Sequence, residues 1–465
     1  MIKFGTGGFR GVIGEDFTKQ NVDLIAQSLS NIIKNSKNKK PVVVGYDYRF
    51  MSDYFAKNFC CVLAGNGIDS LLFDRALPTP SVMAKTMDMD NDFGIMITAS
   101  HNPYIYNGVK LFTKMGKDAD LETTKMLEDE ILKVENVFFS TFEDGVNSGK
   151  IKYIDGFSGY VGKIDKFIDN NIYNNNLKIA FDCMNGVTAP CIEYFRDKYK
   201  LNITVINSNH DAFFRFIAPA PNEKTLIDFK KYIIDNNFDI GFASDADGDR
   251  LGVIDNEGTF YSNNTIMAVI YYYLIKYKNL KGDIVKNNST SYILDMLAKK
   301  LGYKCIEVPV GFKYISSALI ENDALMGGES SGGLTIRGYI YGKDGTFSTM
   351  MLIETLANSG KSLKELYKEV KEFCGYNGTF IESSLKVKDK QKVIDTLNTC
   401  SPKFNKEILK INTEDGFKYF FADNSWANIR FSGTEPLLRI FTEASSPEEA
   451  TRLLDVVNSY IAEIK

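Results

Sequence analysis

Three carboxylates with alternate spacing are the groups in this chain best suited to bind a metal ion. Asp245, Asp247 and Asp249 follow an apolar run at 238–243 that is typical of a buried strand. Carboxylates this close together repel one another unless a cation neutralises them. Hard oxygen ligands favour Mg²⁺, which commonly takes a phosphate oxygen as a further ligand. The spacing therefore favours a magnesium site, to which a phosphate oxygen could be added.

The same aspartate run has other interpretations. With Gly248 it could form only a polar turn. A calcium EF-hand is excluded because its sixth position needs glycine and its twelfth needs glutamate, where this chain has Arg250 and Asn256. In a haloacid-dehalogenase-type phosphatase Asp245 would be the nucleophile, but that interpretation explains none of the other motifs below.

A serine follows another predicted strand, at 93–97, within the sequence T-A-S-H-N-P at 98–103. Open α/β sheets place their chemistry beyond the carboxyl ends of strands, so Ser100 is a candidate nucleophile. His101 adjoins it, and Lys110 brings a cation nearby. Either group could bind phosphate or transfer the proton that the reacting hydroxyl must lose. His210, the second of the two histidines, lies outside the motifs and is expected to be structural.

Two further loops supply groups for a sugar and a phosphate. In the glycine-rich segment 327–332, Glu329 and Ser331 can hydrogen-bond sugar hydroxyls, and the glycines allow close approach of the backbone. After the predicted strand at 426–429, Arg430 offers a planar fork for phosphate. The expected remainder of that anion site is Ser432, Gly433 and Thr434, with Arg439 adding charge.

These four segments resemble the four active-site loops of the α-D-phosphohexomutases, the phosphoglucomutase/phosphomannomutase family. They occur in the family's order, as T-A-S-H-N-P, D-A-D-G-D-R, G-E-S-S-G and R-F-S-G-T-E-P, and they span nearly the whole chain. Near the start, F-G-T-G-G-F-R-G at 4–11 resembles the family's F-G-T-x-G-x-R-G, which matches Thr6 and Arg10. The segment at 310–314 resembles the family's G-x-K-[FY] pattern, which matches Lys313.

The resemblance implies a reaction and a role for each group. Hexose 1-phosphate and hexose 6-phosphate would interconvert through phosphorylated Ser100 and a hexose 1,6-bisphosphate, which also serves as activator. Mg²⁺ would be held by the three aspartates and an oxygen of the phosphorylated serine. Arg10 and Arg250 would bind the transferring phosphate, and Glu329 would bind the 3- and 4-hydroxyls. Lys313 is a further sugar or phosphate contact, and Lys343 is a weaker candidate.

The sugar itself depends on finer differences. The glucosamine branch of the family usually has G-E-Q-S-G-H in the sugar loop, whereas this chain has Ser330 and Gly333 at the variable positions. Phosphoglucomutase or phosphomannomutase activity is therefore favoured. Phosphoglucosamine mutase activity stays open, and so does a non-catalytic sugar-phosphate binding protein on the same scaffold, although intact Ser100 and the intact aspartate run argue against the latter.

Bulk properties are those of a large globular enzyme. A chain of 465 residues is too long for one core and suggests about three or four domains. The net charge of −4 argues against nucleic acid as a partner, so small hexose phosphates are expected, with the chain a monomer or homodimer. The longest apolar run, 266–275, is too short to span a membrane. Scattered cysteines and the lack of a signal-peptide-like apolar segment at the start of the chain predict a cytoplasmic protein.

The elements that must position the loops repeat along the chain. Helical spacing at 18–35, strands at 41–45 and 68–73, and a helix capped by Ser52 predict a mostly parallel sheet covered on both faces. After a polar connector at 140–156, the alternation of strands and helices begins again twice. The last hundred residues are rich in strands. We expect three similar α/β domains and a smaller C-terminal α+β domain around a central cleft, at 1–150, 151–252, 253–372 and 373–465.

Overall fold

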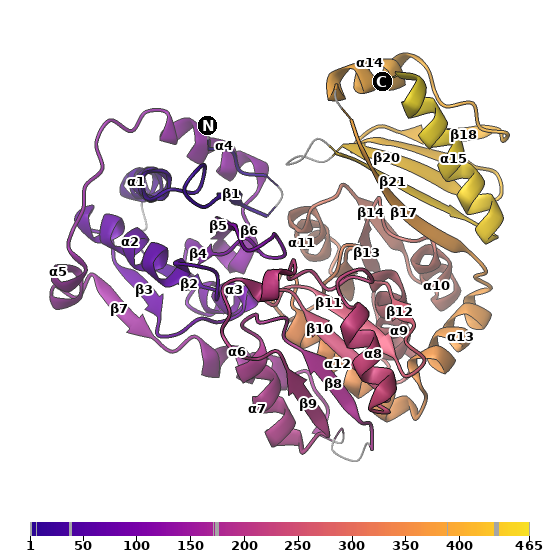
Figure 1. The fold of residues 1–465 in the computed structure, drawn as a ribbon, viewed down its shortest axis with the longest axis horizontal. Helices are drawn as coiled ribbons and strands as arrows, with labels where there is room; N and C mark the ends of the chain where they lie inside the picture. The colour runs from indigo at the N-terminus through magenta and orange to yellow at the C-terminus, as the bar shows by residue number, and fades with distance from the viewer. Residues whose placement is uncertain are drawn as a thin grey trace.

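The computed structural model describes residues 2–5, 7–36, 40–170, 172, 176–387, 389–431 and 437–464. Within these residues the strands form four separate sheets. In Figure 1 the units built on them follow one another in an arc, from the indigo N-terminal unit to the yellow C-terminal unit. The first three sheets are mixed and flanked by helices, and the last is antiparallel, so the predicted fold class is confirmed.

The first unit carries the serine loop at the end of a central strand. Its sheet has the order β1-β5-β4-β2-β3-β7, in which the last four strands are parallel and β6 pairs with β5. The strands are β1 (Phe9–Val12), β2 (Val42–Tyr46), β3 (Ser70–Phe73), β4 (Phe93–Ile97), β5 (Tyr106–Thr113), β6 (Lys117–Asp118) and β7 (Ile151–Ile154). The helices are α1 (Lys19–Asn35), α2 (Ser52–Gly65), α3 (Thr79–Asp88), α4 (Leu121–Ile131) and α5 (Phe142–Asn147).

Two details of this unit differ from the sequence-based expectation. Ser52 is the first helical residue of α2 and not its cap, because its hydroxyl donates to Asp47 Oδ1. The segment expected to be a polar connector at 140–156 forms α5 and β7. Strand β7 is parallel to β3, so the first sheet extends beyond residue 150. A short edge strand with exposed Lys152 and Tyr153 lacks the apolar run by which buried strands are predicted.

The second unit places the aspartate run in a hairpin turn. Its sheet order is β12-β11-β10-β8-β9, and β10 is antiparallel to β11, with Ser244 opposite Leu251. The six residues between them, 245–250, form the turn. The strands are β8 (Ile179–Asp182), β9 (Ile203–Ile206), β10 (Ile240–Ser244), β11 (Leu251–Asp255) and β12 (Phe260–Tyr261), and the helices are α6 (Phe157–Asp165), α7 (Ala189–Tyr199) and α8 (Ile227–Asp235).

The third unit repeats the plan with a shorter sheet, in the order β14-β13-β15-β16. The predicted sugar loop joins the antiparallel strands β15 and β16. The strands are β13 (Ile284–Asn287), β14 (Cys305–Val308), β15 (Met326–Gly328) and β16 (Leu334–Ile336). The helices are α9 (Asn263–Lys276), α10 (Ile293–Leu301), α11 (Phe312–Glu321), α12 (Gly345–Ser359) and α13 (Leu363–Cys374).

The C-terminal unit is an antiparallel sheet in the order β17-β21-β20-β19-β18, with two helices of the described chain beside it. The strands are β17 (Thr379–Lys386), β18 (Ile408–Asn412), β19 (Phe417–Phe421), β20 (Trp426–Phe431) and β21 (Leu437–Ala444). The helices are α14 (Lys390–Thr399) and α15 (Pro447–Ile464). Helix α15 packs on the sheet through Leu453, Val457 and Ile461, which recur at helical spacing.

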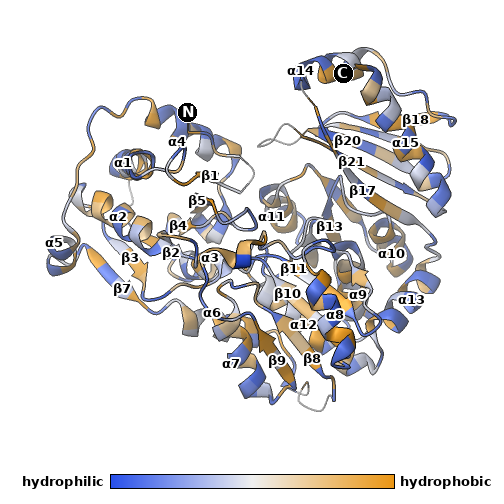
Figure 2. Cartoon of the chain, in the orientation of Figure 1, coloured by the Kyte–Doolittle hydropathy of each residue, from blue (hydrophilic) through white to orange (hydrophobic). Residues whose placement is uncertain are grey.

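A shared apolar core joins the first three units. It runs through the second and third units, includes α9 and α12, and takes in one side of the first sheet, whereas the first and last units also have cores of their own. Figure 2 shows the apolar residues of β8 and β9 and the mixture of polar and apolar residues along the outer helix α13. None of the helices in the described ranges combines the length and apolar character that a membrane span requires.

A buried carboxylate holds the C-terminal unit against the third unit. Glu443 of β21 is 2% exposed and accepts hydrogen bonds from Ser291 Oγ at 2.5 Å and from the backbone N of Tyr292 at 2.7 Å, both in the third unit. It also accepts from Trp426 Nε1 at 2.8 Å and from the Tyr376 hydroxyl. Removal of the carboxylate would leave these buried donors without an acceptor.

We therefore expect Glu443→Ala to lower the stability of the C-terminal unit by at least about 3 kcal/mol, since each unsatisfied donor costs about 1–3 kcal/mol. Trp426 is the single tryptophan of the chain, so its emission during urea unfolding reports on this unit. The control is Glu382→Ala, which removes a half-exposed ion pair with Arg439 and should cost less than about 1 kcal/mol. Equal midpoints for the two variants would contradict the assigned role of Glu443.

Candidate active site

Ser100 lies at the carboxyl end of β4, directly opposite the aspartate turn of the second unit. Its side chain is buried, and its Oγ donates a hydrogen bond to Asp245 Oδ2 at 2.7 Å. The same Oγ lies 3.3 Å from Nδ1 of His101. The backbone of Ser100 has φ = 51°, in the left-handed region that non-glycine residues rarely adopt. Two predicted site residues separated by 145 positions thus meet across a boundary between units.

The three aspartates form a compact and fully buried group. One carboxylate oxygen from each lies within 4.8 Å of the others. Lys110 Nζ, from β5 of the first unit, lies 2.6 Å from both Asp247 Oδ2 and Asp249 Oδ2. Within the described chain, the other oxygens of these two carboxylates, Oδ1 of each, have no hydrogen-bond partner although they are buried. Such orphaned acceptors fit a divalent cation.

The surroundings of the turn shift the pKa values of Asp245 and Asp249 in opposite directions. Burial, together with the charges of Asp247 and Asp249, holds the pKa of Asp245 well above its usual range. Burial acts against ionisation of Asp249 too, but Lys110, Lys343 and Arg250 outweigh it and hold the pKa of Asp249 below its usual range. The cations near Asp249 thus favour its ionised form, whereas burial and the two neighbouring carboxylates disfavour ionisation of Asp245.

Further cations surround the serine. Arg10, on β1, donates from Nη1 to Asn102 Oδ1 at 2.7 Å, and Arg250 donates its backbone N–H to Asp245 Oδ1 at 3.0 Å. Burial and these two guanidinium groups hold the pKa of His101 well below its usual range. Guanidinium groups next to Ser100 and Asp245 are suited to bind the equatorial oxygens of a phosphate. Thr6, also predicted from the N-terminal motif, lies outside the described residues.

In the sugar loop, Glu329 is buried and its Oε1 accepts from the backbone N of Gly311 at 2.9 Å. Its Oε2 lies 3.3 Å from Ser331 Oγ and 4.0 Å from Lys343 Nζ. Lys313 lies in the first turn of α11, close behind Gly311. Of the predicted groups, Ser331 and Lys343 thus lie near Glu329.

Position 333, where the glucosamine branch usually has histidine, has no room for a side chain in this structure. Gly333 has φ = 88°, and a Cβ there would lie 2.6 Å from Lys343 Cβ and 2.8 Å from the backbone oxygen of Asp249. The stem of Lys343 therefore occupies the space that a side chain at position 333 would need. A side chain at position 333 would therefore require the Lys343 stem or the aspartate turn to move.

In the C-terminal unit, the Arg430 side chain lies at the end of β20. Its Nε donates to the carboxylate of Asp415 at 3.0–3.2 Å, and Asp415 Oδ2 also accepts from the backbone N of Val310 at 2.7 Å. Asp415 thus connects Arg430 to the turn before α11. Arg439 pairs with Glu382 at 3.0 Å. Ser432, Gly433 and Thr434 lie outside the described residues.

Several contacts of the site had no recognisable pattern in the sequence. Thr79, at the start of α3, donates from Oγ1 to Asp247 Oδ2 at 2.5 Å and from its backbone N to Asp247 O at 2.8 Å. Gly345 donates its N–H to the backbone oxygen of Gly248 at 2.9 Å. Both residues come from other units than the aspartate turn. Single threonines and glycines have too many ordinary uses for such roles to be predicted.

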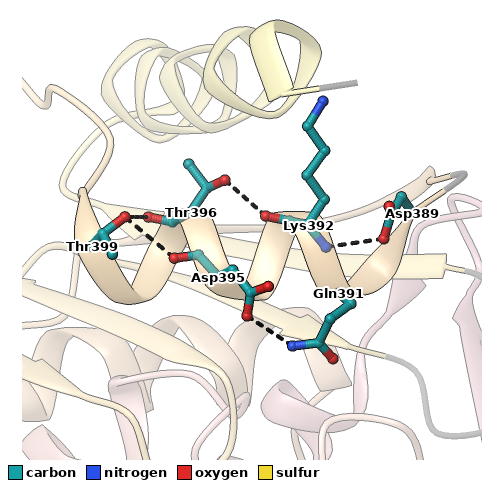
Figure 3. Close-up of a pocket in the computed structure, with 6 residues that line it drawn as sticks. All are labelled: Asp389, Gln391, Lys392, Asp395, Thr396 and Thr399. Atoms are coloured by element: carbon teal, nitrogen blue, oxygen red, sulfur yellow. Dashed lines mark hydrogen bonds between the residues drawn. The ribbon is translucent and has the colours of Figure 1, made fainter.

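A surface depression on α14 shows no comparable chemistry. It is lined by residues of one helix and its cap, Asp389, Gln391, Lys392, Asp395, Thr396 and Thr399 (Figure 3). Asp389 accepts from the backbone N of Lys392 at 3.0 Å, and Gln391 Nε2 donates to Asp395 Oδ1 at 2.8 Å. These polar groups are used in capping and in pairs along the helix.

Comparison with known families agrees with this geometry. Models of the phosphoglucomutase/phosphomannomutase family match the chain as α/β/α domain I at 1–138, domain II at 152–258, domain III at 262–373 and the C-terminal domain at 382–459. The chain belongs to the phosphoglucomutase/phosphomannomutase family. It is thus a phosphohexomutase, an intramolecular phosphotransferase of the isomerase class.

Individual relatives are similar over almost their whole length. A phosphoglucomutase/phosphomannomutase of Thermococcus kodakarensis is 31% identical, with 97% of each chain covered. A phosphoglucosamine mutase of Nautilia profundicola is 29% identical, with 98% of this chain and 97% of its own covered. The solved structure of a Thermus thermophilus protein assigned as a phosphomannomutase has a TM-score of 0.87 and 27% identity, with 99% of each chain covered.

The left-handed backbone of Ser100 gives a stability prediction. Ser100→Gly and Ser100→Ala both lose the hydrogen bond to Asp245, but only alanine keeps a Cβ at φ = 51°. The glycine variant should therefore be the more stable of the two by about 1 kcal/mol in denaturant unfolding. At Ser30, buried inside α1, the alanine variant should instead be more stable than the glycine variant by about 1 kcal/mol. Alanine equal to or better than glycine at position 100 would contradict the assigned strain.

Proposed function

We propose that Ser100 carries the phosphoryl group by which this enzyme interconverts hexose 1-phosphate and hexose 6-phosphate. The observation that supports it most is the 2.7 Å contact between Ser100 Oγ and Asp245, within a buried group of three carboxylates and several cations. A hydroxyl fixed beside a metal-type site and phosphate-binding guanidinium groups is suited to give and accept phosphate.

Mg²⁺ is the proposed metal, and the residues present fit it. Asp245, Asp247 and Asp249 are hard oxygen donors that each place an oxygen within 4.8 Å of the others, and two of their buried oxygens have no hydrogen-bond partner within the described chain. With an oxygen of phosphorylated Ser100 they would make the ligand set. When bound, the ion would neutralise charge on the transferring phosphate.

The residues of the first two units would carry the transfer. Ser100 would give its phosphate to the 6-hydroxyl of a hexose 1-phosphate, forming the 1,6-bisphosphate, and would take the other phosphate back after the sugar reorients. Arg10 and Arg250 would hold the phosphate during both transfers. Lys110 and His101 lie beside the aspartates and the serine, so they are the proposed groups for proton transfer between the sugar hydroxyl and Ser100.

The other two units would hold the sugar. Glu329 and Ser331 would bind its hydroxyls, with Lys313 and Lys343 as further contacts. The far phosphate would be bound by Arg430 together with Ser432, Gly433, Thr434 and Arg439. A bisphosphate that must turn between two transfers needs such an anion site remote from Ser100, so that it is retained within the enzyme.

Glucose and mannose phosphates are the proposed substrates, because Ser330 and Gly333 differ from the usual sugar loop of the glucosamine branch. The Thermococcus relative named phosphoglucomutase/phosphomannomutase supports this choice. Glucosamine phosphate is a second candidate, since relatives of nearly equal identity, including that of Nautilia, are named phosphoglucosamine mutases.

A coupled assay with glucose, mannose and glucosamine 1-phosphates tests the proposal. Wild-type enzyme should show a kcat/KM at least about tenfold higher for glucose or mannose than for glucosamine, the scale at which one substituent is distinguished. Ser100→Ala should lose turnover with all three sugars while still binding them. The reverse order of sugars would favour the second candidate, and an active alanine variant would show that Ser100 is not the carrier.

The metal proposal predicts that chelation abolishes activity and that Mg²⁺ restores it. Added Mg²⁺ should also raise the thermal midpoint of the wild-type protein, because a ligand that binds only the folded state stabilises it. Asp247→Asn should lose both effects. The control Asp182→Asn changes a buried aspartate of the same sheet that is bonded to Met184 N and Asn207, and it should keep both effects. Full activity of Asp247→Asn in chelator would contradict the site.

A further inference from the structure

The backbone of Ser100 is held in its strained conformation by groups outside the proposed reaction. The left-handed conformation at φ = 51° disfavours any residue with a Cβ, so neighbouring contacts must stabilise it. Both backbone polar groups of Ser100 are hydrogen-bonded to buried side chains. These partners come from the segment after β2, which lies outside the sequence motifs, and from Thr98, the first residue of the serine motif, to which the sequence assigned no role.

Arg49 is the partner on the carbonyl side. Its side chain is fully buried, and its Nη2 donates to the backbone oxygens of Ser100 and Asn102, each at 2.6 Å. Its Nη1 donates to the backbone oxygens of Pro103 and Tyr106, each at 3.0 Å. One guanidinium group thus binds four carbonyls of a single loop. Only a planar fork with this many donors can do so, and lysine cannot replace it.

Asp47 and Thr98 act on the amide side. Thr98 Oγ1 accepts from the backbone N of Ser100 at 2.9 Å and donates to Asp47 Oδ2 at 2.6 Å. Asp47 Oδ1 accepts from the backbone N of Arg49 at 3.0 Å and from Ser52 Oγ at 2.9 Å. The carboxylate therefore orients the threonine hydroxyl and the arginine backbone together. The N–H and the C=O of Ser100 are fixed by one connected network.

The second unit covers this network. The Arg49 guanidinium lies 5.1 Å from the ring centroid of Phe214. Phe214 belongs to a turn of the second unit in which it, Arg215 and Phe216 all have positive φ. Asp211 holds that turn by accepting from the backbone N of Phe213 and of Arg215. Phe214 thus covers the guanidinium with an aromatic ring, which strengthens its hydrogen bonds to the carbonyls.

We propose that Asp47, Arg49 and Thr98 form a positioning clamp that fixes the backbone of Ser100 and so aims its Oγ at Asp245. The inference rests on the proposed role of Ser100 as phosphoryl carrier. None of the three side chains needs to touch the sugar or the transferring phosphate. The clamp acts on the attack geometry alone, while sugar binding depends on the third and fourth units.

Because the clamp affects the attack geometry and not sugar binding, its loss should change kcat with little change in KM. A displacement of about 1 Å at a reacting atom can lower the rate about a hundredfold. Thr98→Val keeps the side-chain shape but removes the hydroxyl that accepts from Ser100 N. We expect kcat to fall about ten- to a hundredfold, with KM for hexose phosphate within about twofold of the wild-type value. Arg49→Lys should lower kcat by at least the same factor.

The control is Thr86→Val, which removes another fully buried threonine hydroxyl, bonded to Val82 O within α3. It should keep wild-type kcat and KM. A second measurement follows phosphorylation of Ser100 by glucose 1,6-bisphosphate, using intact mass at a temperature well below thermal unfolding. Thr98→Val should be phosphorylated about ten- to a hundredfold more slowly than Thr86→Val, in parallel with kcat.

The outcomes separate the clamp from the function on which it rests. If Ser100→Ala is inactive and Thr98→Val matches Thr86→Val in kcat and phosphorylation rate, the clamp is wrong and the carrier assignment stands. If Thr98→Val raises KM and leaves kcat unchanged, the network serves sugar binding and the inference also fails. If Ser100→Ala keeps full activity, both proposals fail. Thr98→Val is close to isosteric, so it tests the clamp even if Arg49→Lys does not fold.

Discussion

The repulsion among three buried carboxylates on one short turn is the constraint on which the rest of the site depends. Asp245, Asp247 and Asp249 could not remain together in a buried position without compensating groups, and the chain brings these groups from other units. Lys110 comes from the first sheet and contacts two of the carboxylates. Thr79 binds Asp247 from the start of α3. The hairpin of the second unit is therefore the point at which the units must meet.

The same turn explains the packing of the third unit. Glycines at 333 and 345 let its backbone lie directly on the backbone of the aspartate turn, where a Cβ would clash. The stem of Lys343 fills the space over Gly333, which brings its ammonium group near Glu329. Farther away, Asp415 and Glu443 attach the C-terminal unit to the third unit by accepting hydrogen bonds from backbone N–H groups of the third unit. Ion pairs or hydrogen bonds between units thus hold each of these boundaries.

Features contained in a short stretch of sequence could be predicted, whereas contacts between residues far apart in the sequence could not. Ser100 and the aspartate run lie in short motifs after apolar strands, so both the strands and the reactive groups could be recognised, and the structure brings them together. Thr79 and Asp247 are separated by 168 positions, and no spacing rule connects them. The edge strand β7 was missed because its exposed residues resemble a connector. Arg49 could not be found, since its role depends on four carbonyls that only the folded loop presents.

The central claim is that each turnover exchanges phosphate between the sugar and Ser100. It is tested most directly by mixing fully phosphorylated, unlabelled enzyme with hexose 1-phosphate that carries a ³²P-labelled phosphate, for a single turnover. The account predicts that the label ends on the peptide containing Ser100 and that the hexose 6-phosphate carries the enzyme's unlabelled phosphate. Label retained on the hexose 6-phosphate, with none on Ser100, would mean that the phosphate migrates within the sugar and would contradict the account.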